Sequence, residues 1–148
     1  MNNRGIRILD NVNGHVSVRL PDVLEEIHSG DQLHWSILYL WAIGDLGNVD
    51  QTEISHYDRG LIISWADLNR LAQNIYQTID LVLIGDKNES FLHRYESDEI
   101  MHRTCHVVIE MIDSSYWEIF SVDNGLIDRL VKKFKQIEFI EDRGPLEA

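Results

Sequence analysis

Two glutamates stand in consecutive strand-like segments of the C-terminal half. Glu110 lies in the apolar segment 106–112 and Glu118 lies in 116–121. If the loop between these segments is the three residues 113–115, the two carboxylates oppose each other on one face of a hairpin. Such a like-charge pair raises the pKa of one acid or attracts a cation or a basic side chain. Paired carboxylates also catalyse glycoside hydrolysis, whereas a two-residue loop would place both acids on opposite faces in solvent.

His102 and His106 are a second candidate pair, because their spacing could suit metal binding. Four residues apart on a helix, the two imidazoles could bind zinc. This segment instead has the pattern of the start of a strand, where that spacing is too wide, so we predict no metal site. Cys105 precedes an apolar strand and is expected to be a small core residue. The sequence contains no Gly-x-Ser-x-Gly elbow and no phosphate-binding glycine loop, and we predict no catalytic residue and no cofactor.

An irregular acidic stretch over residues 44–60 supplies candidate binding residues. Exposed aromatic rings among acidic side chains make good anchors for a protein partner. Trp41 flanks the stretch and is expected in the core, whereas Tyr57 suits either the core or an interface. The predicted partner-binding residues are Asp45, Asp50, Glu53, Tyr57 and Asp58, together with Glu110 and Glu118.

The charge of the chain restricts its partners. Its formal net charge is −12, and residues 20–100 hold fifteen acidic residues against four basic ones, a net of −11. Nucleic acid and anionic membranes are bound by basic surfaces, so we predict neither as a partner. A basic protein would be attracted and steered, although excess acid also serves to keep proteins dispersed.

The length of 148 residues suits one domain, 1–148, with frayed ends at about 1–5 and 142–148. The N-terminal residues lack the apolar run of a signal peptide, and the single cysteine excludes an internal disulfide. We therefore expect a cytoplasmic bacterial protein. Its oligomeric state is open.

Apolar periodicity predicts a single α+β fold, a mixed or mostly antiparallel sheet packed by two main helices. The best helix is predicted at 65–78, where Ser64 is the N-cap and an apolar stripe follows. A second helix is predicted from Asp123 or Asn124 through Phe134. Short helical segments are expected after Pro21 and at 97–101, and strands at 6–9, 15–20, 33–43, 81–84, 106–112, 116–121 and 137–140. The strands at 6–9 and 15–20 are expected to pair with each other around the turn-rich link 11–14.

Four segments together resemble a family of small bacterial proteins, the immunity proteins of polymorphic-toxin systems. They are residues 33–47 (LHWSILYLWAIGDLG), 60–65 (GLIISW), 79–85 (IDLVLIG) and 109–118 (IEMIDSSYWE). The similarity covers about residues 6–140. It implies a small cytosolic protein that binds and blocks a toxin of the same cell, often a basic nuclease. No motif of the four is a catalytic signature, and no residue role is carried over.

The sequence therefore favours an immunity protein that occludes a toxin by binding it. Two alternatives stay open. One is a small acid–base hydrolase that uses the Glu110/Glu118 hairpin. The other is a regulatory or scaffold domain with a different protein partner.

Overall fold

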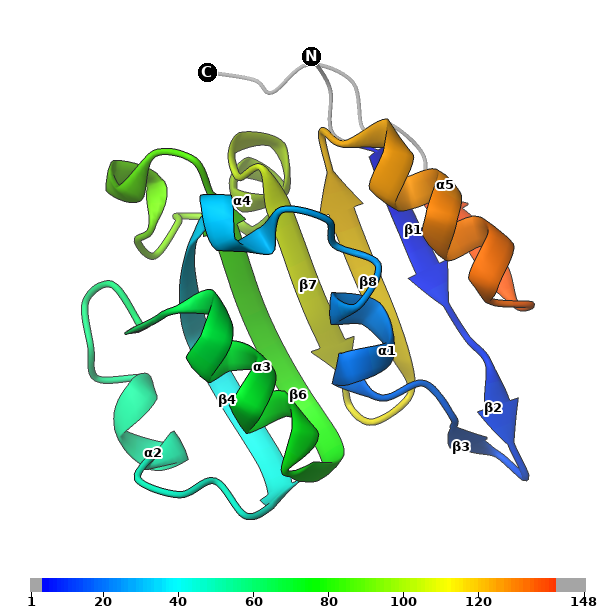
Figure 1. Ribbon diagram of the computed structural model, residues 1–148, viewed down its shortest axis with the longest axis horizontal. Coiled ribbons are helices and arrows are strands. Elements are labelled where there is room, and N and C mark those ends of the chain that lie inside the picture. The colour runs from blue at the N-terminus through cyan, green and yellow to red at the C-terminus, as the bar shows by residue number, and fades with distance from the viewer. Residues whose placement is uncertain (1–3, 141–148) are drawn as a thin grey trace.

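A computed structural model describes residues 4–140 of the chain. Within these residues, every pairing of the main sheet is antiparallel, and its seven strands have the order β5-β4-β6-β7-β8-β1-β9. These strands are β1 (Arg4–Ile8), β4 (His34–Gly44), β5 (Leu61–Ile63), β6 (Ile75–Asp86), β7 (Val107–Ile112), β8 (Tyr116–Ser121) and β9 (Ile137–Ile140). β2 (Asn11–Val12) and β3 (His15–Val16) form a separate hairpin that projects from the body in Figure 1. The predicted α+β class is confirmed.

The helices divide unequally between the two faces of the sheet. Helices α1, α3 and α5 cover one face, and α4 lies behind the opposite one (Figure 1). The remaining helix, α2, lies along the outer side of β4. The bounds are α1 (Leu20–Leu24), α2 (Gln51–Ile54), α3 (Trp65–Gln73), α4 (Asp98–Thr104) and α5 (Asn124–Lys133), with 3-10 turns η1 (Gly30–Gln32) and η2 (Glu89–Phe91).

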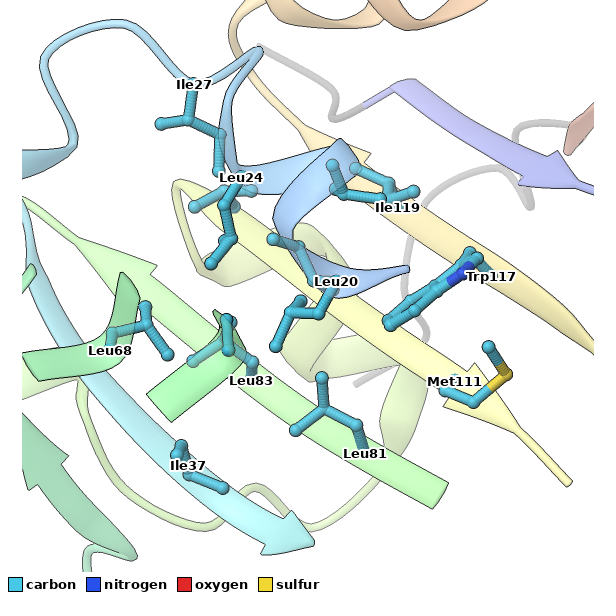
Figure 2. Packing of buried hydrophobic residues seen from close by; sticks show 14 of the residues in the cluster. Leu20, Leu24, Ile27, Ile37, Leu68, Leu81, Leu83, Met111, Trp117 and Ile119 are labelled. Carbon is cyan, nitrogen blue, oxygen red and sulfur yellow. The ribbon is translucent and has the colours of Figure 1, made fainter. Parts of the chain in front are cut away.

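The larger core fills the space between the sheet and α1, α3 and α5. Because side chains alternate along a strand, β6 directs Leu81 and Leu83 to this face and β8 directs Trp117 there. Figure 2 shows Leu20 and Leu24 of α1 pointing toward these strands. All five side chains are buried, and burial of this apolar surface is the main force that holds the helices on the sheet.

A smaller core lies on the opposite face, at the end of the sheet that α4 covers. We call this end the covered half. It contains Cys105, as the sequence predicted, together with Leu38, Ile84, Leu92, Met101, Val108 and Phe120. The other end of this face has no helix over it among residues 4–140 (Figure 1).

The predicted helix at 65–78 is too long. Ser64 caps α3 as predicted, since its Oγ accepts the N–H of Asp67 at 3.1 Å. The helix ends at Gln73, however, and β6 begins at Ile75. The β-branched residues of segment 75–79 pair with β4, because such side chains fit a pleated sheet. The strand predicted at 81–84 is consequently twelve residues long.

The predicted pairing of segments 6–9 and 15–20 is wrong. β1 pairs with β8 and β9, which places Ile6 and Ile8 in the larger core. Within residues 6–20, the only strands that pair with each other are the two-residue strands β2 and β3, which form a hairpin. Its turn at Asn13 and Gly14 has positive φ at both residues, as a tight hairpin turn requires.

The remaining predicted elements agree with the structure to within a few residues. The acidic stretch contains a short helix, α2, and the C-terminal helix and strand are α5 and β9. The helical turn predicted at 97–101 continues to Thr104, so His102 lies on a helix and His106 lies beyond it. Of the predicted frayed ends, residues 4–5 belong to β1, whereas residues 1–3 and 142–148 lie outside the described residues.

Candidate functional site

One row of side chains crosses the second face of the sheet at the border of the covered half. The register places residues from six neighbouring strands opposite one another, in the order Tyr39, Val82, Glu110, Glu118, Arg7 and Glu138. The loop of the β7–β8 hairpin is the three residues 113–115, so of the two arrangements that the sequence left open, the structure has the one in which Glu110 and Glu118 oppose each other on one face.

Glu110 is buried and paired with a histidine. Ser97 caps α4, since its Oγ accepts the N–H of Ile100 at 3.2 Å. His102 lies on this helix and packs against the sheet. The His102 Nε2 and Glu110 Oε1 atoms are hydrogen-bonded, and both side chains are about 7% exposed. The imidazole also stacks on Phe120, with 3.7 Å between the ring centres. Glu110 is therefore an internal, paired group and is not available to a partner.

Glu118 is held by an arginine from the other end of the chain. Arg7 Nε and Nη2 both donate to Glu118 Oε2, at 3.1 and 2.8 Å. Its Nη1 donates to Glu138 at 3.4 Å, and the guanidinium lies 4.5 Å from the centre of the Tyr116 ring. The hydrogen bonds that Arg7 donates to Glu118 raise the pKa of Arg7, so the guanidinium stays charged. The two glutamates avoid a like-charge conflict because each has its own basic partner.

From this row to the tip of the β7–β8 hairpin, the second face of the sheet is open and partly aromatic. Tyr39, Trp41 and Ile43 alternate with buried Leu40 and Ala42 along β4, so the three share one face. Trp41 is 52% exposed, and the prediction that it is a core residue is wrong. We define the open face as Tyr39, Trp41, Ile43, Asp80, Val82, Ile112, Tyr116 and Glu118.

The tip of the β7–β8 hairpin closes the open face at its far end. Asp113 and Ser114 both have positive φ, 46° and 58°, which is unfavourable for residues with a side chain. Two hydrogen bonds fix this conformation: Asp113 N–H donates to Asp80 Oδ1 at 2.9 Å, and Ser114 N–H donates to the Ile79 carbonyl at 2.8 Å. The tip is thus tied to β6, and the open face has a fixed boundary.

The five predicted contact residues of the acidic stretch are all exposed, but two of them also have local structural roles. We call residues 45–58 the acidic segment. Asp50 caps α2, where its Oδ1 accepts the N–H and the hydroxyl of Thr52 at 3.0 and 2.7 Å. Asp45 Oδ1 accepts the N–H of Gly47 at 3.1 Å. Glu53 and Asp58 have no side-chain hydrogen bond or ion pair with another residue of 4–140.

Side chains rather than a strand hold the acidic segment against β4. Gln51 Oε1 accepts the N–H of Ala42 at 2.8 Å. Arg94 donates to the carbonyls of Leu38 and Ile54, both at 2.8 Å, and to that of Tyr57 at 3.2 Å. These bonds also occupy backbone groups on the outer edge of β4, which protects the edge against pairing with another strand. The acidic segment therefore lies beside the aromatic side of the open face in a defined conformation.

The comparisons with known proteins give no relative to guide the interpretation. No protein family, curated protein or solved structure matches this chain. Within residues 4–140, no group of three or more His, Cys, Asp or Glu side chains is arranged to hold a metal ion. No helix in that part of the chain is long and apolar enough to cross a membrane.

Sequence reasoning found the glutamate pair and the acidic segment but missed their surroundings. Arg7 and His102 were not linked to the glutamates, and Tyr39 and Trp41 were not placed on an exposed face. The alternation of Tyr39, Trp41 and Ile43 with Leu40 and Ala42 was a signal for two faces, but every one of these residues is apolar or aromatic. The site as a whole offers rigid aromatic surface beside fixed acidic groups.

Proposed function

We propose that this chain is a bacterial cytoplasmic immunity protein that binds a basic toxin domain and blocks it by occlusion, without turnover. The observation that carries the proposal is the open face, an exposed aromatic surface on a rigid sheet, bordered by the acidic segment. The resemblance of the four sequence segments to immunity proteins gives it further support.

Three physical properties of this surface favour protein binding. Aromatic rings such as Tyr39 and Trp41 bury much area and lose little entropy on binding. The strands and the tethered acidic segment are already ordered, so binding loses little conformational freedom. Acidic groups such as Glu53 and Asp58 speed the approach of a basic partner and disfavour nucleic acid.

The hydrolase alternative receives less support from the same geometry. A glycosidase pair requires one carboxyl group to donate a proton and the other to attack or to activate water. Glu110 is buried against His102, and Glu118 is bonded to Arg7. Both carboxylates are therefore engaged within the fold. A regulatory or scaffold domain would use the same surface and would differ in its partner.

The test is to search beside this gene for a coding sequence with a toxic C-terminal domain, to express that domain in cells with and without this protein, and to measure growth. We expect rescue of growth and a stable complex on a sizing column. A Glu53→Lys/Asp58→Lys variant should associate more slowly, on the order of tenfold at low salt, because it removes the charges that steer the partner.

The matched control is Asp31→Lys/Asp67→Lys. It changes the net charge by the same amount as the first double variant, but its substitutions lie on η1 and α3. It should keep most of the wild-type association rate. Equal slowing in both double variants would show that only overall charge matters and would contradict the proposed surface. Absence of both rescue and complex would refute the immunity role for this toxin.

A further inference from the structure

A hollow of about 360 Å³ lies where the open face meets the acidic segment. One wall is β4 and the other is α2. The residues that line it are Tyr39, Leu40, Trp41, Gln51, Thr52 and Ser55. This hollow combines aromatic surface with polar groups, and the fold itself leaves both accessible.

The β4 wall offers two kinds of contact. The rings of Tyr39 and Trp41 are 44% and 52% exposed, so part of each ring can be covered by a ligand. Ala42 directs its N–H toward Gln51 on the α2 side. Since alternate residues of a strand direct their backbone groups the same way, the N–H and C=O of Leu40 also face the hollow.

The charges near the hollow favour a cation. α2 carries Asp50 at its N-cap and Glu53 in its single turn, and Asp80 lies opposite Trp41 on the same face. The bonds from Thr52 lower the pKa of Asp50, so this carboxylate stays ionised well below neutral pH. Arg94 is the cation bonded to this edge of β4, and it already donates to three backbone carbonyls.

We propose that this hollow seats the guanidinium group of an arginine on the protein partner. A planar guanidinium stacks on an exposed indole more favourably than an ammonium does, and it can donate to a carbonyl such as that of Leu40 at the same time. The identity of the partner protein rests on the proposed function, whereas the preference for arginine rests on the hollow alone.

The experiment is a titration of the ¹⁵N-labelled chain with N-acetyl-arginine amide at constant ionic strength, followed by NMR. We expect saturable shifts of the Trp41 indole and of the backbone amides of Leu40, Thr52 and Ser55. The buried indoles of Trp35 and Trp117, which donate to the Gly30 and Val18 carbonyls, serve as internal controls and should not move. N-acetyl-citrulline amide, the neutral isostere, should produce much smaller shifts.

A Trp41→Leu variant should weaken arginine binding about two- to fivefold, as expected for loss of an exposed cation–π contact. Phe91→Leu, which changes another exposed aromatic residue, should leave binding unchanged. Equal shifts with citrulline, or shifts that do not centre on the hollow, would overturn the proposal. If arginine-specific shifts are seen but this protein does not rescue cells from the neighbouring toxin, the arginine site is retained and only the immunity role is rejected.

Discussion

The covered half and the open face lie on the same strands but use their side chains differently. On β8, Phe120 is buried beneath α4 in the covered half, whereas Tyr116 is half-buried on the open face. On β4, Leu38 belongs to the smaller core and Trp41 is exposed. Apolar side chains in the covered half hold helix and sheet together. Those of the open face are more exposed, so we expect them to contribute less to stability, and folding and the proposed binding should be separable by mutation.

The largest predicted effect compares two tryptophans. Trp117 is fully buried in the larger core, and its Nε1 donates to the Val18 carbonyl at 2.9 Å. Trp117→Ala should lower the free energy of unfolding by about 3–5 kcal/mol, because it leaves a large cavity. Trp41→Ala on the open face should change it by only about 0.5 kcal/mol. Urea unfolding measures both, and similar losses would remove the distinction between the two regions.

The next effect concerns the buried pair at the border of the covered half. His102→Leu should cost about 3 kcal/mol, because the buried carboxyl group of Glu110 then loses its hydrogen-bond partner. The double variant His102→Leu/Glu110→Leu should recover most of that loss, since no buried polar group is left unpaired. Thermal and urea unfolding of the two variants measure this difference. A double variant as unstable as the single one would mean that packing of the imidazole on Phe120 dominates.

A smaller effect is expected at Arg7, beside the open face. Arg7→Met should cost about 1 kcal/mol, because the ion pair with Glu118 is partly screened by solvent. The more exposed pair of Arg4 and Asp128 gives the control: Arg4→Met should have almost no effect. Unfolding at low and high salt tests both variants, and equal effects would contradict the special position of Arg7.

The last prediction is a dependence of stability on pH, which arises in the covered half and is seen only above neutral pH. Burial raises the pKa of the Cys105 thiol from 9.0 to about 11. The folded state therefore favours the neutral thiol, and this contribution to stability is complete below pH 9 and is lost as pH rises toward 11.

Native protein at pH 8 should react with a thiol reagent far more slowly than urea-unfolded protein. Rapid labelling of the native chain would show that the covered half opens readily.

Much of the fold was determined by local signals in the sequence. Ser64 caps its helix as predicted, and Asp123, one of the two predicted candidates, caps the other, because an oxygen three residues before an amide meets it in the first helical turn. The three-residue loop at 113–115 fixed the register of the β7–β8 hairpin and thereby placed Glu110 opposite Glu118. These features depend on neighbours along the chain, so residue type and spacing indicated them, although the sequence left both a two- and a three-residue loop open for the hairpin.

Only the tertiary structure decided which partners these residues meet. Arg7 reaches Glu118 across 111 positions because β1 inserts between β8 and β9, and no local pattern specifies that insertion. Segment 75–79 has the period of a helix, yet it pairs with β4 and extends β6. Trp41 has the composition of a core residue, but it is exposed because no helix covers its end of the second face among residues 4–140. Burial is a property of what packs above a residue, and that is set by segments far away in the sequence.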